Sequence, residues 1–200
     1  LAAGAERGWI GKDAAEAQVK TTLEFFSGKM ESEHGFFYHF VDMETGKRFR
    51  DSELSSIDTA LFLAGALTAA RYFENPEIKG LAKKLYERAD WKWMANGSLF
   101  LSMGWTPENN FLPHAWSDYN ESLVMYILAM GSPTFPLTAE SWTAIRRTRG
   151  KYKDYELILS PPLFTHQFSH AFIDFRNKRD AFADYFKNSV QATLANRQFC

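Results

Sequence analysis

Apolar residues recur at helical spacing in several long segments of the chain. In the first segment, Ala17, Leu23 and Phe26 lie on one stripe, and Gly28 stands where a C-terminal cap belongs. In a later one, Ser55 or Ser56 supplies the N-cap and Asp58 lies in the first turn. Ser117 or Asp118 would cap a further helix that ends at Gly131. The pattern predicts helices over residues 13–27, 57–73, 77–96, 119–130, 138–149 and 180–199.

Aromatic and β-branched runs between these segments predict short strands. Residues 35–42 form one such run, and Thr45-Gly46 supplies a turn, so we expect a small hairpin that continues to Phe49. Residues 98–105 and 155–159 are also typical of strands, and a short helix is expected after Pro162.

The predicted helices alternate in character along the chain. Residues 57–73 and 119–130 are apolar almost all round, which is typical of helices buried on most sides, whereas 77–96 and 138–149 are amphipathic. Concentric inner and outer helices produce this alternation. We therefore predict a mainly α fold, an α/α toroid or its first half, with short β-hairpins in the loops, as one domain over residues 1–200. A plain helical bundle is the alternative.

Composition narrows the classes of function. Hydrophobic residues make up 46% of the 200 residues, charged residues 24%, and the net charge is −1. No overall field therefore draws nucleic acid, and the longest apolar run is too short for membrane insertion. The lone Cys200 excludes an internal disulfide framework, and no Gly-rich nucleotide loop or Gly-x-Ser-x-Gly elbow is present. The aromatic content of 16% suits a large core or a groove that stacks on sugar faces.

Residues 114–121 form the first candidate site. Asp118 and Glu121 are three apart, and His114, Trp116 and Tyr119 surround them in sequence. The two acids could simply cap a helix and complement its dipole. Paired carboxylates flanked by aromatic side chains are also what a glycosidase needs, one to protonate the leaving oxygen and the other to activate water. Both interpretations stay open on this pattern.

Two further segments carry candidate residues. Glu53 and Asp58 lie at the start of the apolar helix 57–73. Glu53 could be an exposed loop residue and Asp58 a cap partner, or both carboxylates could face a cavity. His166, His170 and Asp174 recur every four residues and would share one helix face. They could bind sugar hydroxyls from a cleft wall or be satisfied core residues, and a two-histidine, one-carboxylate metal centre is the least favoured alternative.

Several blocks of the sequence resemble the bacterial glycoamylase-like domain family. They are GFFYHFVD at 35–42, ELSSIDTALFLAG at 53–65, WSDYNE at 116–121, YILAMGSP at 126–133, PLFTHQFSHAFIDFR at 162–176, DYFKNSV at 184–190 and NRQFC at 196–200. The resemblance implies an (α/α)6 toroid of the six-hairpin glycosidase type. It also implies glycoside hydrolase chemistry, because the relatives include endo-β-1,2-glucanases and the transglycosylating domain of cyclic β-1,2-glucan synthases.

The resemblance assigns roles to the candidate residues. It implies that Asp118 and Glu121 are the acidic pair of the catalytic cleft, with Asp58 as a third catalytic carboxylate. The expected substrate-binding residues are Glu53, His114, Trp116, Tyr119, His166, His170 and Asp174. Family members are about twice as long, so we expect this chain to be an incomplete toroid that lacks its C-terminal half and folds poorly alone.

The expected activity is hydrolysis of a β-linked glucan, with β-1,2-glucan as the leading substrate, without cofactor or metal. An inverting enzyme needs its two working carboxyl groups about 6.5–9.5 Å apart, more than neighbours three apart on a helix provide. Glu121 is the expected proton donor, because the apolar helix behind it would favour its neutral form, with a partner elsewhere. We expect the starts of the two apolar helices to direct these acids into one aromatic-walled cavity.

Two alternatives stay open. The same cleft could transglycosylate, or the domain could bind carbohydrate without turnover. The expected partner is an oligo- or polysaccharide, and the family implies a periplasmic or secreted location.

Overall fold

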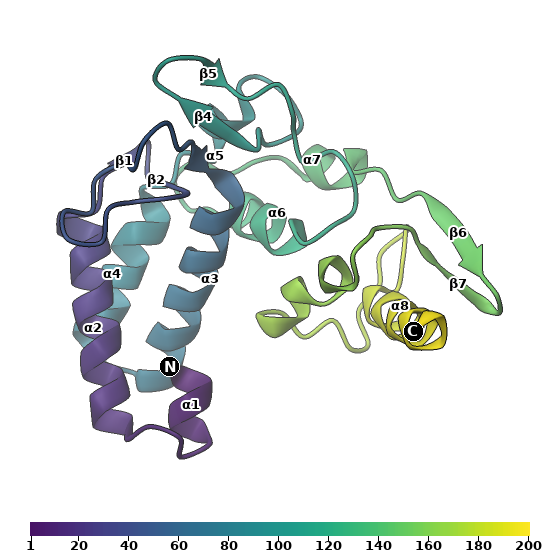
Figure 1. Cartoon of the computed structure of the whole chain (residues 1–200), viewed down its shortest axis with the longest axis horizontal. Helices are drawn as coiled ribbons and strands as arrows, with labels where there is room; N and C mark the ends of the chain where they lie inside the picture. The colour runs from purple at the N-terminus through teal and green to yellow at the C-terminus, as the bar shows by residue number, and fades with distance from the viewer.

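The structure is a computed structural model that describes residues 1–200, and it is mainly helical (Figure 1). The α-helices are α1 (Ala2–Glu6), α2 (Lys12–Gly28), α3 (Ser56–Phe73), α4 (Pro76–Glu87), α5 (Trp91–Ala95), α6 (Leu123–Met130), α7 (Ala139–Ala144) and α8 (Tyr185–Phe199), with 3-10 helices η1 (Leu163–His166) and η2 (Phe168–Ala171). None of the helices is both long enough and apolar enough to cross a membrane.

A small antiparallel sheet lies across one end of the first helices (top of Figure 1). Its strands pair in chain order and are β1 (Ser32–Glu33), β2 (Phe36–Tyr38), β3 (Leu54–Ser55), β4 (Gly104–Thr106) and β5 (Asn110–Phe111). Leu54 pairs with Tyr38 on one side and with Trp105 on the other. Because β3 runs directly into α3, the sheet fixes where α3 begins.

The N-terminal helices α2, α3 and α4 pack side by side below this sheet (Figure 1). Leu63 of α3 and Ile78 and Leu85 of α4 are fully buried, and each such side chain contributes about 1.5–3 kcal/mol relative to exposure. Phe36 of β2 meets Trp91 of α5 edge to face, with ring centroids 5.3 Å apart. Sheet and helices therefore share one apolar core.

The second half of the chain is organised around α8. The hairpin of β6 (Arg149–Tyr152) and β7 (Tyr155–Ile158) forms a separate two-stranded sheet. Helix α8 packs against β7 and η1, and α6 packs against α3. Thus α6 connects the C-terminal elements to the N-terminal helices.

The helices predicted over 13–27 and 57–73 are confirmed as α2 and α3, and Ser55 Oγ accepts the Asp58 N–H as expected of an N-cap. The other four helices differ in extent, and the segment 119–130 is helical only from Leu123. The segment 77–96 is two helices, because the Asp90 side chain caps α5 separately. The segment 138–149 is helical only to Ala144, and 180–199 only from Tyr185, where Asp184 supplies the cap.

The predicted strands are shorter than expected and pair differently. The hairpin through Phe49 is confirmed only near its turn, where Val41 bridges Arg48 and the Phe49 N–H donates to the Phe40 carbonyl, whereas β2 itself pairs with β1 and β3. Strand β4 begins at Gly104 rather than at Ser98. The mainly helical class with small antiparallel sheets is confirmed, whereas the closed toroid stays a prediction.

Two glycine substitutions test the sheet–helix junction. Gly35 has φ +82°, and an added Cβ would clash with the backbone carbonyl of Arg88 and lie 2.7 Å from the Ala89 Cα. Gly35→Ala should therefore lower the free energy of unfolding by more than about 1 kcal/mol. Gly80→Ala, in open space on α4, should raise it by about 0.5–1 kcal/mol. Urea unfolding measures both values, and equal effects at the two positions would contradict the close approach of Gly35 to the backbone just after α4.

Candidate functional site

The start of α3 gathers a histidine and two carboxylates. The pairing of β2 with β3 places His39 opposite Glu53, whose carbonyl accepts the His39 N–H at 2.8 Å. His39 Nδ1 lies 2.9 Å from Glu53 Oε1, and Nε2 lies 3.7 Å from Asp58 Oδ2. Sheet register and helix start thus place Glu53 and Asp58 on the two sides of one imidazole ring.

Asp58 lies in the first turn of α3, where the helix dipole favours a negative charge. Its side chain is 49% exposed, and that of Glu53 is 30% exposed. Water therefore reaches both carboxylates, and neither is a buried core residue.

Trp116 connects this cluster to the loop before α6. Its indole Nε1–H donates to Ser56 Oγ at 2.9 Å, and the fully buried Ser56 hydroxyl donates to the Ser102 carbonyl at 2.7 Å. Tyr126 OH donates to the Trp116 carbonyl at 2.8 Å. The segment that carries Asp118 and Glu121 is thereby fixed against the first turn of α3, which carries Asp58.

Asp118 forms a two-pronged ion pair rather than a helix cap. Arg146 Nη2 lies 2.6 Å from Asp118 Oδ2, and Arg146 Nε lies 2.8 Å from Oδ1. Hydrogen bonding from the guanidinium holds the pKa of Asp118 below its usual range. Both side chains are more than half exposed, so the pair stabilises the fold by less than about 1 kcal/mol. Its main effect is to keep this carboxylate ionised and fixed in direction.

Glu121 lies in the turn that precedes α6, which begins at Leu123. Asp118 and Glu121 therefore do not share the first turn of a helix, and that expectation is wrong. The Glu121 carbonyl accepts the Ser169 hydroxyl at 3.0 Å, and the same hydroxyl accepts the Val124 N–H at 3.0 Å. The carboxyl group of Glu121 is half-buried. Unlike those of Glu53, Asp58 and Asp118, it makes no hydrogen bond or ion pair.

Tyr119 and His166 form a buried polar cluster with Asn188 of α8. The Tyr119 hydroxyl lies 3.3 Å from His166 Nδ1, and Asn188 Nδ2 donates to that hydroxyl at 3.1 Å. Burial raises the pKa of Tyr119 to about 12 and lowers the pKa of His166. Both side chains are neutral and hydrogen-bonded in the interior. Their contacts are therefore those of core residues whose polar groups have partners.

His170 and Asp174 do not extend this cluster. The segment folds into η1 and η2, so the three residues do not line one helix face as the four-residue spacing predicted. Asp174 is exposed and paired with Arg176, whereas His170 packs against Phe175 with ring centroids 4.7 Å apart. No group of three or more His, Cys, Asp or Glu side chains is arranged to hold a metal ion.

His114 lies on the loop between β5 and α6 and is exposed. Its carbonyl accepts the Met103 N–H at 3.0 Å, and its ring has no hydrogen-bond partner. The ring is therefore free to meet a ligand, although nothing in the structure directs it toward the carboxylates.

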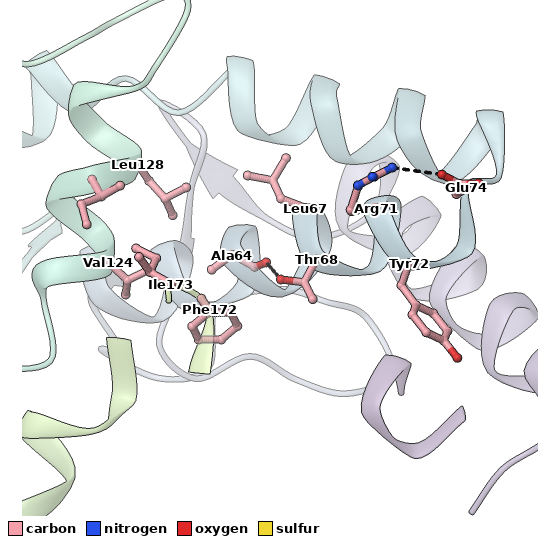
Figure 2. A pocket seen from close by; sticks show the side chains of 11 residues that line it. Ala64, Leu67, Thr68, Arg71, Tyr72, Glu74, Val124, Leu128, Phe172 and Ile173 are labelled. Atoms are coloured by element: carbon pink, nitrogen blue, oxygen red, sulfur yellow. Dashed lines mark hydrogen bonds and ion pairs between the residues drawn. The ribbon is translucent and has the colours of Figure 1, made fainter. Parts of the chain in front are cut away.

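The largest cavity lies elsewhere (Figure 2). It has a volume of about 780 Å³ and is lined mainly by apolar side chains of α3, α6 and the segment after η2, including Leu67, Val124 and Phe172, with the Arg71–Glu74 ion pair at one end. No predicted catalytic carboxylate lines it or the other main cavities. The expectation of one aromatic-walled cavity shared by the acids therefore stays a prediction.

Sequence reasoning missed two residues of the site. His39 lay in a run that was interpreted only as a strand, and Arg146 in a basic stretch typical of a solvated helix end. No local pattern marks either residue, because their partners lie 14 and 28 positions away in the chain.

Comparisons with known proteins agree with the predicted family. Residues 113–200, which include Asp118 and Glu121, match the Glycoamylase family, described as "Putative glucoamylase". The predicted resemblance to the glycoamylase family is confirmed. An exo β-1,2-glucooligosaccharide sophorohydrolase (non-reducing end) from Parabacteroides distasonis is 24% identical, in an alignment that covers all of this chain and 33% of that protein.

Solved structures of glycoamylase relatives share the fold. A "putative glucoamylase" from Bacteroides uniformis superposes with a TM-score of 0.91 at 27% identity, over 98% of this chain and 53% of that one. An endo-β-1,2-glucanase from Chitinophaga pinensis, solved with sophorotriose and glucose, gives 0.85 at 27% identity, over 99% and 53%. The chain thus spans about half the length of these structures and a third of the curated relative.

The buried histidines predict how stability depends on pH. Burial lowers the pKa of His166 and of His170, so as pH falls below about 6.5 the unfolded chain takes up protons that the folded chain does not. The free energy of unfolding should therefore fall as the pH drops below about 6.5, by up to about 1.4 kcal/mol per pH unit for each histidine. Urea unfolding of His166→Gln should give a shallower slope, with exposed His114→Gln as the control. An unchanged slope in His166→Gln would contradict the assignment.

Proposed function

We propose that this chain carries the acid–base carboxylates of a glycoside hydrolase that acts on β-1,2-linked glucan. The observation that supports this most is the Trp116–Ser56 hydrogen bond, because it joins the two segments that hold Asp58 and Asp118. Further support comes from the relatives, which include a β-1,2-glucooligosaccharide sophorohydrolase and an endo-β-1,2-glucanase.

The surroundings of the acids suggest a division of roles. Asp118 is held ionised by Arg146, so it is unsuited to donate a proton, and its lowered pKa also makes it a weak base. We assign it to accepting hydrogen bonds from sugar hydroxyl groups. Glu121, whose side chain has no partner, is the proposed proton donor to the glycosidic oxygen.

Asp58 is the proposed base. In an inverting reaction this carboxylate takes a proton from water as the water oxygen bonds to the anomeric carbon, while Glu121 protonates the departing oxygen and the glycosidic bond breaks. Asp58 lies on a different element from Glu121, which suits the separation of about 6.5–9.5 Å that leaves room for this water. Trp116 and the exposed His114 are the proposed contacts with the sugar rings.

Substrate specificity is the first test. The chain should release short β-1,2-linked oligosaccharides from β-1,2-glucan and leave β-1,3- and α-1,4-glucans intact, as followed by chromatography of the products. Cyclic or lengthened products would instead indicate a transglycosylase. Binding of sophorotriose without any turnover would indicate a carbohydrate-binding domain, and neither binding nor turnover would refute the proposal.

Substitution of the acids tests the assigned roles. Glu121→Gln should reduce kcat at least about 100-fold, because the general acid is lost, with an unchanged circular dichroism spectrum. Asp118→Asn should raise KM more than it lowers kcat. Glu140→Gln, a carboxylate in the first turn of α7, serves as the matched control and should have wild-type kinetics. Full activity of Glu121→Gln would refute its role as the donor.

A further inference from the structure

The imidazole of His39 lies between two carboxylates that approach its two nitrogens separately. Glu53 Oε1 is within hydrogen-bond distance of Nδ1 at 2.9 Å, whereas Asp58 Oδ2 is 3.7 Å from Nε2. The ring of Phe40 stacks on the imidazole, with centroids 4.2 Å apart and planes 12° apart. Stacking and the Glu53 contact together fix the plane of the imidazole.

The Glu53 contact also fixes the tautomer. An ionised carboxylate only accepts hydrogen bonds, so Nδ1 must carry the hydrogen that points to Glu53. A neutral imidazole has one N–H, and its Nε2 then faces Asp58 with a lone pair. The free energy of that arrangement is unfavourable when Asp58 is ionised, because two acceptors face each other.

A hydrogen on Nε2 removes this conflict, because the N–H then points toward the Asp58 carboxylate. The 3.7 Å between Nε2 and Asp58 Oδ2 is longer than a direct hydrogen bond but within the range of an ion pair.

We propose that His39 is the positioning residue of this site: Glu53 fixes its Nδ1–H tautomer, and its Nε2 faces Asp58 and orients that carboxylate. This inference rests on the proposed function only in giving Asp58 a catalytic role. The arrangement of Glu53, His39 and Asp58 stands on the geometry of β2, β3 and the first turn of α3 (Figure 1).

The chain offers a matched control for this proposal. His34 is also 42% exposed, stacks on Trp93 with centroids 4.2 Å apart, and lies 3.7 Å from Glu33 and 4.0 Å from Asp90. It lies in the turn between β1 and β2, outside the junction of α3 with the loop before α6. Exposure, stacking and nearby carboxylates are therefore common to both histidines, whereas the 2.9 Å contact with Glu53 and the approach to Asp58 belong to His39 alone.

Nitrogen NMR of the imidazole rings tests the geometry without any substrate. The neutral His39 ring should show the Nδ1–H tautomer in the wild-type chain. Asp58→Asn should shift the Nε2 resonance of His39 and leave both ring resonances of His34 unchanged. An Nε2–H tautomer at His39, or a His39 ring that does not respond to Asp58→Asn, would overturn the proposal.

Kinetics test the positioning role. In His39→Asn the side-chain amide can replace Nδ1 toward Glu53 but has no group toward Asp58, so kcat on β-1,2-glucooligosaccharides should fall about tenfold or more with KM unchanged. In His39→Gln the longer amide reaches toward Asp58 and should restore part of kcat. His34→Asn should have wild-type kinetics, and wild-type kcat in His39→Asn would overturn the role.

The two sets of measurements separate the two proposals. If the chain does not hydrolyse β-1,2-glucooligosaccharides but the NMR results are as expected, the proposed function fails and the arrangement of Glu53, His39 and Asp58 stands. If hydrolysis is observed and the tautomer is wrong, the proposed function stands and the positioning role of His39 fails.

Discussion

The hydrogen bond from the Trp116 indole to the buried Ser56 hydroxyl is the contact on which the candidate site depends. Ser56 is fully buried and already donates to the Ser102 carbonyl, so its remaining lone pair needs a donor, and Trp116 supplies one. A buried polar group without its partner costs about 1–3 kcal/mol, which makes alternative placements of the loop before α6 unfavourable. This requirement helps to hold Asp118 and Glu121 in place relative to Asp58, although the acids carry like charges that repel one another.

Three neighbours set the surroundings of the four acids. Arg146 keeps Asp118 ionised and fixed in direction, Ser169 holds the backbone of Glu121 and leaves its side chain free, and His39 connects Glu53 with Asp58. These neighbours come from the segment before β6, from η2 and from the residue just after β2, which are far apart in the chain. The acids thereby differ in partner and in freedom of direction, with Glu53 and Asp58 sharing one imidazole, which is the condition for separate acid, base and binding roles.

Part of the candidate site was predictable because it depends on local sequence. Ser55 and Asp58 were assigned to the start of α3, where short-range capping decides the structure. The cap pattern at Asp118 was misleading, because Arg146 takes that carboxylate and α6 begins only at Leu123. The spacing of His166, His170 and Asp174 also misled, since the segment folds into two 3-10 turns rather than one helix. A side chain that could cap a helix can instead form an ion pair, and tertiary packing can override a helical spacing of residues. Both outcomes depend on residues that are distant in the chain.

The sequence by itself determined the mainly helical class, the extent of α2 and α3, the resemblance to the glycoamylase family and the identity of the acidic residues. Local propensity, capping and composition are sufficient for these features, since they act over a few neighbouring positions. Only the tertiary structure decided which acid is paired, which is free and which faces an imidazole. Those states depend on contacts between residues that are 14 to 48 positions apart, and such contacts form only when the whole chain packs.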